Sequence, residues 1–124
     1  MMIDLDHFKK INDNLGHVVG DEVLIEFAAF IESYAKQKDL FGRWGGEEFI
    51  LVCPSTDLDT AKQFAEELRA GVYDHSFNHS NDLSCSIGLA QYDDQESASD
   101  LIRRADQALY RAKSKGRNRV ELAI

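Results

Sequence analysis

The chain has 124 residues, of which 44% are apolar and 29% charged, and its formal net charge is −8 at pH 7. This size and composition are typical of one globular domain, and no apolar run is long enough to span a membrane. The acidic charge argues against a general nucleic-acid-binding protein, which needs a basic surface. Because no secretion leader opens the chain, we expect a cytoplasmic protein whose Cys53 and Cys85 are reduced core thiols.

Strand-like and helix-like patterns alternate along the chain. Strands are expected at 1–6, 40–44, 47–53, 83–92 and 119–124, a polar loop at 73–82, and helices at 8–13, from Asp21 to about Lys38, around 61–72 and at 97–116. Gly16 is expected to end the first short helix, and the Gly45-Gly46 pair predicts a tight hairpin. This order predicts an α+β fold in which helices pack on one mixed sheet with a ferredoxin-like βαββαβ core.

Carboxylates occur at the end of the first strand and at the hairpin. Asp4 and Asp6 share one face of a strand because side chains alternate, although aspartates at strand ends are also common turn formers. Glu47 and Glu48 follow glycines that permit positive φ and close approach of another molecule. If the two strands are neighbours, these carboxylates could hold Mg²⁺, which takes oxygen ligands and leaves room for substrate phosphates.

Basic residues are concentrated near the C-terminus, where seven of the 14 lie between Arg103 and Arg119. A solvated helix end explains this cluster, since cations favour helix C-termini. A phosphate-binding patch on an acidic protein explains it equally well. The pattern by itself leaves both interpretations open.

Four blocks of the sequence, at 2–24, 43–49, 86–90 and 105–120, resemble the GGDEF family, the diguanylate cyclases. They read MIDLDHFKKINDNLGHVVGDEVL, RWGGEEF, SIGLA and ADQALYRAKSKGRNRV. The resemblance implies the palm-type fold of nucleotidyl cyclases. It also implies condensation of two GTP molecules into cyclic di-GMP with release of two pyrophosphates, in a homodimer where each domain holds one GTP.

Family members usually carry a helical segment with a D-x-L-T-x-L-x-N-R pattern before the first strand. We therefore expect a single GGDEF-like domain, 1–124, that is N-terminally truncated relative to the family. A sensory or receiver domain, which often provides dimerisation in this family, is expected to be missing. Trp44 stands where the family usually has Tyr or Phe and is expected to be a packing residue.

The resemblance implies a metal site formed by the two groups of carboxylates. Asp4 and the carbonyl of Leu5 match ligands of Mg²⁺ (or Mn²⁺), and Glu47 is expected to bind the same ion. Glu48 is expected either to bind a second metal or to help deprotonate the attacking 3′-hydroxyl, so it counts as both a metal and a catalytic residue.

The resemblance also implies a substrate-binding segment directly after the first strand. Phe8 and Lys9 begin the turn that cradles the phosphates, and Lys9 is counted among the catalytic residues. Asn12 and Asp21 match the pair that reads the guanine edge. His17 is expected to have a structural role near this guanine loop.

The basic C-terminal cluster acquires a role from the same resemblance. Lys113 and Arg117 match the cations that bind the β- and γ-phosphates. Neutralisation of a triphosphate is what phosphoryl transfer requires of a protein.

A product-inhibition site is expected to be degenerate. The family's R-x-x-D pattern falls on Lys36 and Asp39, and lysine lacks the planar fork with which arginine binds phosphate or guanine. A second arginine of the family is replaced by carboxylates near Glu67. Arg69 could compensate if its helix presents it on the right face.

Two classes of function compete for this chain. The first is a diguanylate cyclase, which the intact GGEEF stretch together with Asn12, Asp21 and Lys113 favours. The alternative is a non-enzymatic module that binds GTP or cyclic di-GMP or mediates dimerisation, which the missing N-terminal segment favours. A polymerase-like or adenylyl cyclase palm is a distant third, because Asn12 and Asp21 favour guanine.

Overall fold

The computed structural model describes residues 1–79 and 82–124, so residues 80 and 81 of the predicted polar loop lie outside the described part. The described elements are β1 (Met2–Leu5), α1 (Phe8–Tyr34), β2 (Leu40–Gly45), β3 (Glu48–Val52), α2 (Leu58–Asp74), β4 (Cys85–Leu89), α3 (Ala98–Ser114) and β5 (Val120–Leu122). The five described strands form one sheet with the order β2-β3-β1-β4-β5. Only the β4–β5 pair is parallel among these strands. The predicted α+β fold with one mixed sheet is confirmed.

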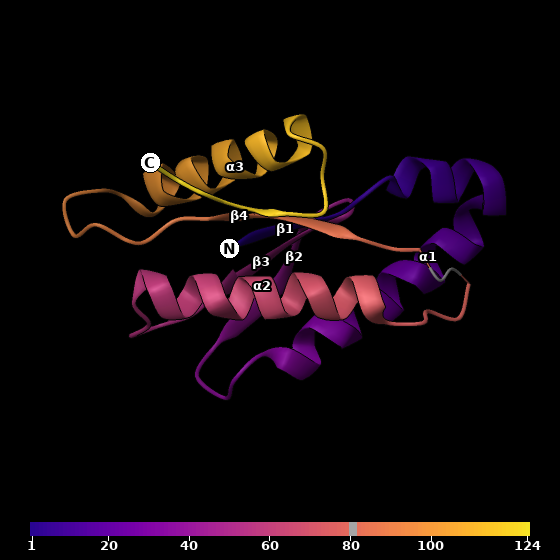
Figure 1. Cartoon of the computed structure of the whole chain (residues 1–124), viewed down its shortest axis with the longest axis horizontal. Helices are drawn as coiled ribbons and strands as arrows, with labels where there is room; N and C mark the ends of the chain where they lie inside the picture. The colour runs from indigo at the N-terminus through magenta and orange to yellow at the C-terminus, as the bar shows by residue number, and fades with distance from the viewer. Residues whose placement is uncertain (80–81) are drawn as a thin grey trace.

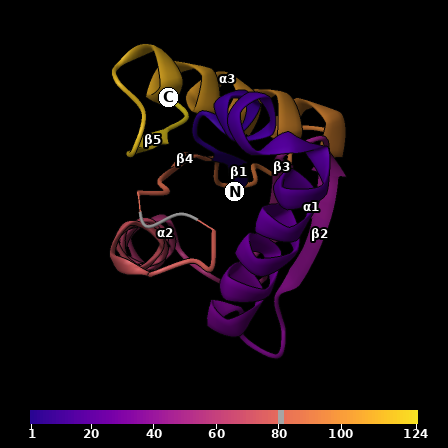
Figure 2. The same ribbon diagram turned by 90° about the vertical axis from the view of Figure 1, so that its right-hand side faces the viewer.

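The helices pack on both faces of this sheet, with α1 and α2 on one side and α3 on the other (Figures 1 and 2). Ile3 and Leu5 of β1 pack with the residues of α1 and α2 in the larger core cluster. Met2 belongs to a second cluster with Ala105 and Leu109 of α3. Because side chains alternate along a strand, Asp4, two residues after Met2, also faces α3.

Helix α1 begins at Phe8, as the sequence predicts, but its second part begins and ends earlier than expected. The predicted interruption occurs at Gly16, whose φ of 85° and ψ of 164° are not helical. The helix resumes immediately after Gly16 instead of at Asp21, so that prediction is wrong. It ends at Tyr34 rather than near Lys38 because the chain becomes extended at Ala35.

The β2–β3 hairpin has its turn one residue later than predicted. Gly45 is the last residue of β2, and the turn consists of Gly46, with φ of 52°, and Glu47. The pairing is irregular between Arg43 and Gly45. Trp44, which the sequence predicts to be a packing residue, lies in this irregular part and is 53% exposed, so at least half of it faces solvent instead.

Helix α3 begins where the sequence predicts because Ser97 caps it. The Ser97 hydroxyl accepts a hydrogen bond from the Asp100 amide, and the Asp100 carboxylate accepts one from the Ser97 amide, which is a capping box. No helix in the described part of the chain is long and apolar enough to cross a bilayer. Cys85 is buried, Cys53 is half-buried, and both are free thiols as predicted.

Candidate functional site

The sheet brings the two predicted groups of carboxylates together. Asp4 of β1 is the direct cross-strand partner of Glu48 in β3, and the Leu5 amide donates to the Glu47 carbonyl at 3.4 Å. Asp4 is only 3% exposed, whereas Glu47 and Glu48 are half-buried. β1 and β3 are therefore neighbours, which the sequence alone did not show. Three carboxylates lie at one end of the sheet as a result.

Lys113 of α3 forms an ion pair with Oδ2 of Asp4 at this end of the sheet. Burial, together with the charges of Glu47 and Glu48, raises the pKa of Asp4 to about 6 despite the opposing effect of Lys113. Burial also raises the pKa of Glu48, and the nearby charges of Asp106 and Glu47 add to this effect. Burial lowers the pKa of Lys113, but its ion pair with Asp4 and the surrounding carboxylates produce a net rise.

The raised pKa of Asp4 predicts a pH-dependent contribution to stability. The folded chain keeps this proton up to about pH 6, whereas an ordinary aspartate loses it near 3.8. The folded state therefore binds more protons in this window, and its stability falls as the pH rises. We expect the Asp4→Asn variant, which cannot ionise there, to gain roughly 2 kcal/mol relative to the wild type between about pH 4 and pH 7. Urea unfolding across this range checks this, and a constant difference would contradict it.

The donor atoms at this site suit a hard divalent cation. Carboxylates of Asp4, Glu47 and Glu48 and the Leu5 carbonyl are the oxygen ligands that Mg²⁺ prefers. Within residues 1–79 and 82–124, no three His, Cys, Asp or Glu side chains already form a metal-binding group. The buried Oδ2 of Asp4 has no hydrogen bond of normal geometry, and the Lys113 ammonium stands beside it. A positive charge thus already occupies the place where a cation is expected, and the residues fit Mg²⁺ once Lys113 moves away.

Across the break in α1, Asn12 lies against Gly20, the residue directly before the exposed Asp21. A Cβ atom added to Gly20 would lie 1.8 Å from Oδ1 of Asn12, so the Asn12 side chain rests on the Gly20 backbone, next to Asp21. Oδ1 of Asn12 is buried and has no hydrogen-bond partner among the described residues. Buried polar atoms normally have partners, so this acceptor is suited to a donor from a bound molecule.

The predicted phosphate-binding residues lie at two helix ends. Phe8 is buried, so its N–H rather than its ring is available, and Lys9 beside it is exposed. The first N–H groups of a helix lack intrahelical acceptors and favour anions. Arg117 lies exposed in the turn after α3, the helix that carries Lys113, and His17 lies exposed just after the break in α1.

The residues of the predicted inhibitory site are engaged in local contacts. The ammonium of Lys36 lies 5.8 Å from the centre of the Phe64 ring. Asp39 Oδ2 accepts a hydrogen bond from the Lys36 amide at 2.8 Å. Arg69 donates to Asn118 Oδ1 at 2.9 Å, so it is directed toward the end of α3 instead of toward Lys36.

Two residues near the predicted site have structural contacts that the sequence did not predict; Asp6 was considered only as a possible Mg²⁺ ligand beside Asp4, and Gly20 was given no role. Gly20 supports Asn12, and Asp6, which is 5% exposed, accepts hydrogen bonds from two serines and a backbone amide. The signal for Asp6 was its shared strand face with Asp4. The signal for Gly20 was its position directly before Asp21.

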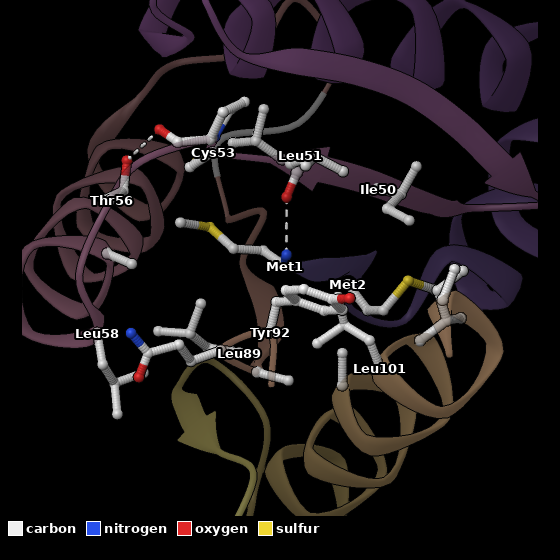
Figure 3. Close-up of a pocket in the computed structure, with 18 of the residues that line it drawn as sticks. Met1, Met2, Ile50, Leu51, Cys53, Thr56, Leu58, Leu89, Tyr92 and Leu101 are labelled. Atoms are coloured by element: carbon white, nitrogen blue, oxygen red, sulfur yellow. Dashed lines mark hydrogen bonds between the residues drawn. The ribbon is translucent and has the colours of Figure 1, made fainter. Parts of the chain in front are cut away.

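A cavity of about 570 Å³ lies at the opposite end of β1 from Asp4 (Figure 3). Its mostly apolar lining includes Met1, Leu51, Leu89 and Leu101. The N-terminal amine donates to the Leu51 carbonyl at 2.7 Å, and burial lowers the pKa of this amine. The cavity contains none of the residues predicted to bind metal or nucleotide, so it is separate from the candidate site.

Comparison with known proteins identifies close relatives. The diguanylate cyclase DgcM of Escherichia coli is 50% identical over 120 residues, which cover 97% of this chain and 29% of that protein. The response regulator PleD of Caulobacter vibrioides is 42% identical over 126 residues, covering 97% and 28%. The chain therefore spans less than a third of the length of these two relatives.

Solved structures share the fold. The active GGEEF domain of a diguanylate cyclase from Vibrio cholerae superposes with a TM-score of 0.90 at 39% identity, covering 99% of this chain and 80% of that one. The GGDEF domain of DgcB from Caulobacter crescentus, solved with c-di-GMP, gives 0.91 at 35% identity, covering 98% and 75%. The family model described as "Diguanylate cyclase, GGDEF domain" matches residues 1–119. The chain belongs to the GGDEF family.

Proposed function

We propose that this chain is the catalytic domain of a diguanylate cyclase. Two GTP molecules would be joined when the 3′-hydroxyl of each attacks the α-phosphate of the other, giving cyclic di-GMP and two pyrophosphates. The observation that carries the proposal is the cross-strand pairing of Asp4 with Glu48, with Lys113 beside them. This reaction requires carboxylates that bind a metal and a cation that binds phosphates, close together in one site.

The side chains divide the work of positioning and neutralisation. Bound Mg²⁺ or Mn²⁺, held by Asp4, Glu47 and Glu48 with the Leu5 carbonyl, would lower the pKa of the 3′-hydroxyl and stabilise the leaving pyrophosphate. Burial raises the pKa of Glu48, which makes this carboxylate a better acceptor for the hydroxyl proton.

Cations and helix ends would bind the phosphates. Lys113 and Arg117 neutralise the β- and γ-phosphates, and the N–H groups at Phe8 and Lys9 receive phosphate oxygens at the start of α1. The Lys9 ammonium is exposed and would offset charge that develops in the transition state.

Guanine would be read by Asn12 and Asp21, with His17 in a supporting role nearby. The unpaired Oδ1 of Asn12 can accept a hydrogen bond from the guanine N–H groups. The Asp21 carboxylate is a second acceptor, and adenine has no matching donors at these positions. A site built on such bonds rejects analogues that leave its polar groups unpaired.

Replacing Gly20 by alanine is expected to separate stability from specificity. The new methyl group must displace Asn12, whose Oδ1 lies 1.8 Å from its place, while alanine stabilises a helix by about 0.5–1 kcal/mol relative to glycine. We expect an equal or higher melting temperature and roughly tenfold or greater loss of the preference for GTP over ATP. Calorimetric titration with both nucleotides checks this, and an unchanged preference would contradict it. Ala29→Gly, at an exposed position of α1, is the control for the change in helix propensity.

The direct test is incubation of the chain with GTP and Mg²⁺ at high protein concentration, with detection of cyclic di-GMP by mass. Accumulation of product from GTP and none from ATP supports the proposal. GTP binding without product would favour the non-enzymatic alternative. Cytoplasmic location stays a prediction.

Product inhibition through Lys36 and Asp39 is expected to be weak. Both side chains are engaged locally, and Arg69 is paired with Glu66 and Asn118. We expect cyclic di-GMP to bind poorly, and Lys36→Arg alone to leave binding weak. Titration calorimetry checks this, and tight binding that disappears in Asp39→Ala would contradict it.

A further inference from the structure

The turn that connects α3 to β5 has an unusual backbone. Three consecutive residues have positive φ: 119° at Gly116, 65° at Arg117 and 46° at Asn118. Glycine adopts such angles freely and asparagine does so often, but arginine does so rarely. The turn leads from the end of α3 back to the sheet, where β5 pairs with β4 (Figure 1). Contacts with the surrounding protein must hold it in this conformation.

Those contacts come from two other elements. The Asn118 amide donates to Oδ2 of Asp6 at 3.0 Å, and Asn118 Oδ1 accepts from Arg69 of α2 at 2.9 Å. The Arg117 amide also donates back to the Ala112 carbonyl in the last turn of α3 at 2.9 Å. The Arg117 side chain is left exposed directly beside the anchored residue.

Asp6 is itself held rigidly. Its Oδ2 also accepts from the Ser84 hydroxyl and its Oδ1 from the Ser86 hydroxyl, each at 2.7 Å. A buried carboxylate with three donors has a fixed orientation. Asp6 also follows Asp4 by two residues and shares its face of the sheet. One strand end therefore fixes both the carboxylate expected to bind metal and the turn that carries Arg117.

We propose that Asp6 is a positioning residue for the triphosphate. It holds the Gly116–Asn118 turn so that Arg117 keeps a fixed position relative to Asp4. Asp6 acts through Asn118 and does not touch the substrate. The inference rests on the proposed function, because it takes Arg117 as a ligand of the β- and γ-phosphates.

The experiment compares two ligands that differ only beyond the α-phosphate. Titration calorimetry with Mg²⁺ measures binding of an α,β-methylene GTP analogue, which cannot release pyrophosphate, and of GMP. In Asp6→Asn we expect the analogue to bind about tenfold more weakly, as for other residues that orient a ligand-binding group, and GMP to bind as in the wild type. Asn118→Gly, which keeps the backbone conformation but removes the contact with Arg69, should give a smaller loss of the same kind.

Two control variants make the result interpretable. Ser97→Ala removes the capping box at the opposite end of α3 and should leave both affinities unchanged. Arg117→Ala should weaken only the analogue. Weak binding in Arg117→Ala with wild-type binding in both Asp6→Asn and Asn118→Gly overturns the positioning role and leaves the proposed function intact. Wild-type binding in Arg117→Ala overturns the phosphate-binding role itself. Equal weakening of GMP and analogue in Asp6→Asn reveals a general structural role and also overturns the inference.

Discussion

A chain in which Glu47 is replaced by glutamine is expected to fold normally and to make no detectable cyclic di-GMP. The Glu47 carbonyl accepts a hydrogen bond from the Leu5 amide. Glu47 thus contacts the neighbouring strand through its backbone, and this contact is kept in the variant. Glutamine has nearly the same shape but lacks the charge that binds Mg²⁺. Because enzymes accelerate such reactions mainly by electrostatic stabilisation of the transition state, we expect a loss of at least about 10³-fold in rate.

The stability of this variant should be equal to or higher than that of the wild type, because a like charge beside Asp4 and Glu48 is removed. Production of cyclic di-GMP, Mn²⁺ binding by electron paramagnetic resonance and thermal unfolding together check the prediction. Glu32→Gln, an exposed position on α1, is the control for the change in net charge. Full activity in Glu47→Gln would exclude the proposed metal role.

Activity per molecule is expected to rise with protein concentration. Each domain is proposed to hold one GTP, and the hydroxyl of that GTP must reach the α-phosphate of a GTP held by a second copy. Fusion to a dimeric leucine zipper raises the effective concentration of the second copy to about the millimolar range. We therefore expect the fusion to be roughly tenfold or more active per molecule under dilute conditions.

The matched control is the same fusion with polar residues at the apolar seam of the zipper, which keeps the added mass but prevents pairing. Cyclic di-GMP formation is measured across a broad dilution series for both fusions and the free chain. A constant rate per molecule for the free chain, with identical rates for the two fusions, would argue against a reaction that needs two copies.

The local signals of the sequence predicted several elements well. The capping residue Ser97 marked the start of α3, and the short apolar run that ends in carboxylates marked β1. The early part of α1 was harder to predict, because Leu15 and Val18 are 48% and 74% exposed and give no buried stripe. The sequence predicted the hairpin turn at Gly45-Gly46, one residue too early. The irregular pairing around Trp44 shifts the turn, and two neighbouring glycines do not reveal that irregularity.

The candidate site was predictable in its residues and unpredictable in its contacts. The resemblance to a known family placed Asp4, Glu47 and Lys113 in one site, but the residues themselves did not show that β1 and β3 are neighbours. That pairing joins positions far apart in the chain and depends on packing of the whole sheet. The ion pair between Lys113 and Asp4, and the role of Asp6 beneath the last turn, depend on the same long-range packing.

The position of β1 in the middle of the sheet gives the two halves of the site different resistance to opening. β1 is fully buried and paired on both sides, so its amides should exchange with solvent only when the whole domain unfolds. Glu47 lies in a hairpin whose strand β2 is at the sheet edge and largely exposed. Such edges open at lower free energy than central strands. On mild heating, the Glu47 side of the site should therefore separate first, while Asp4 stays in its native place until the fold is lost.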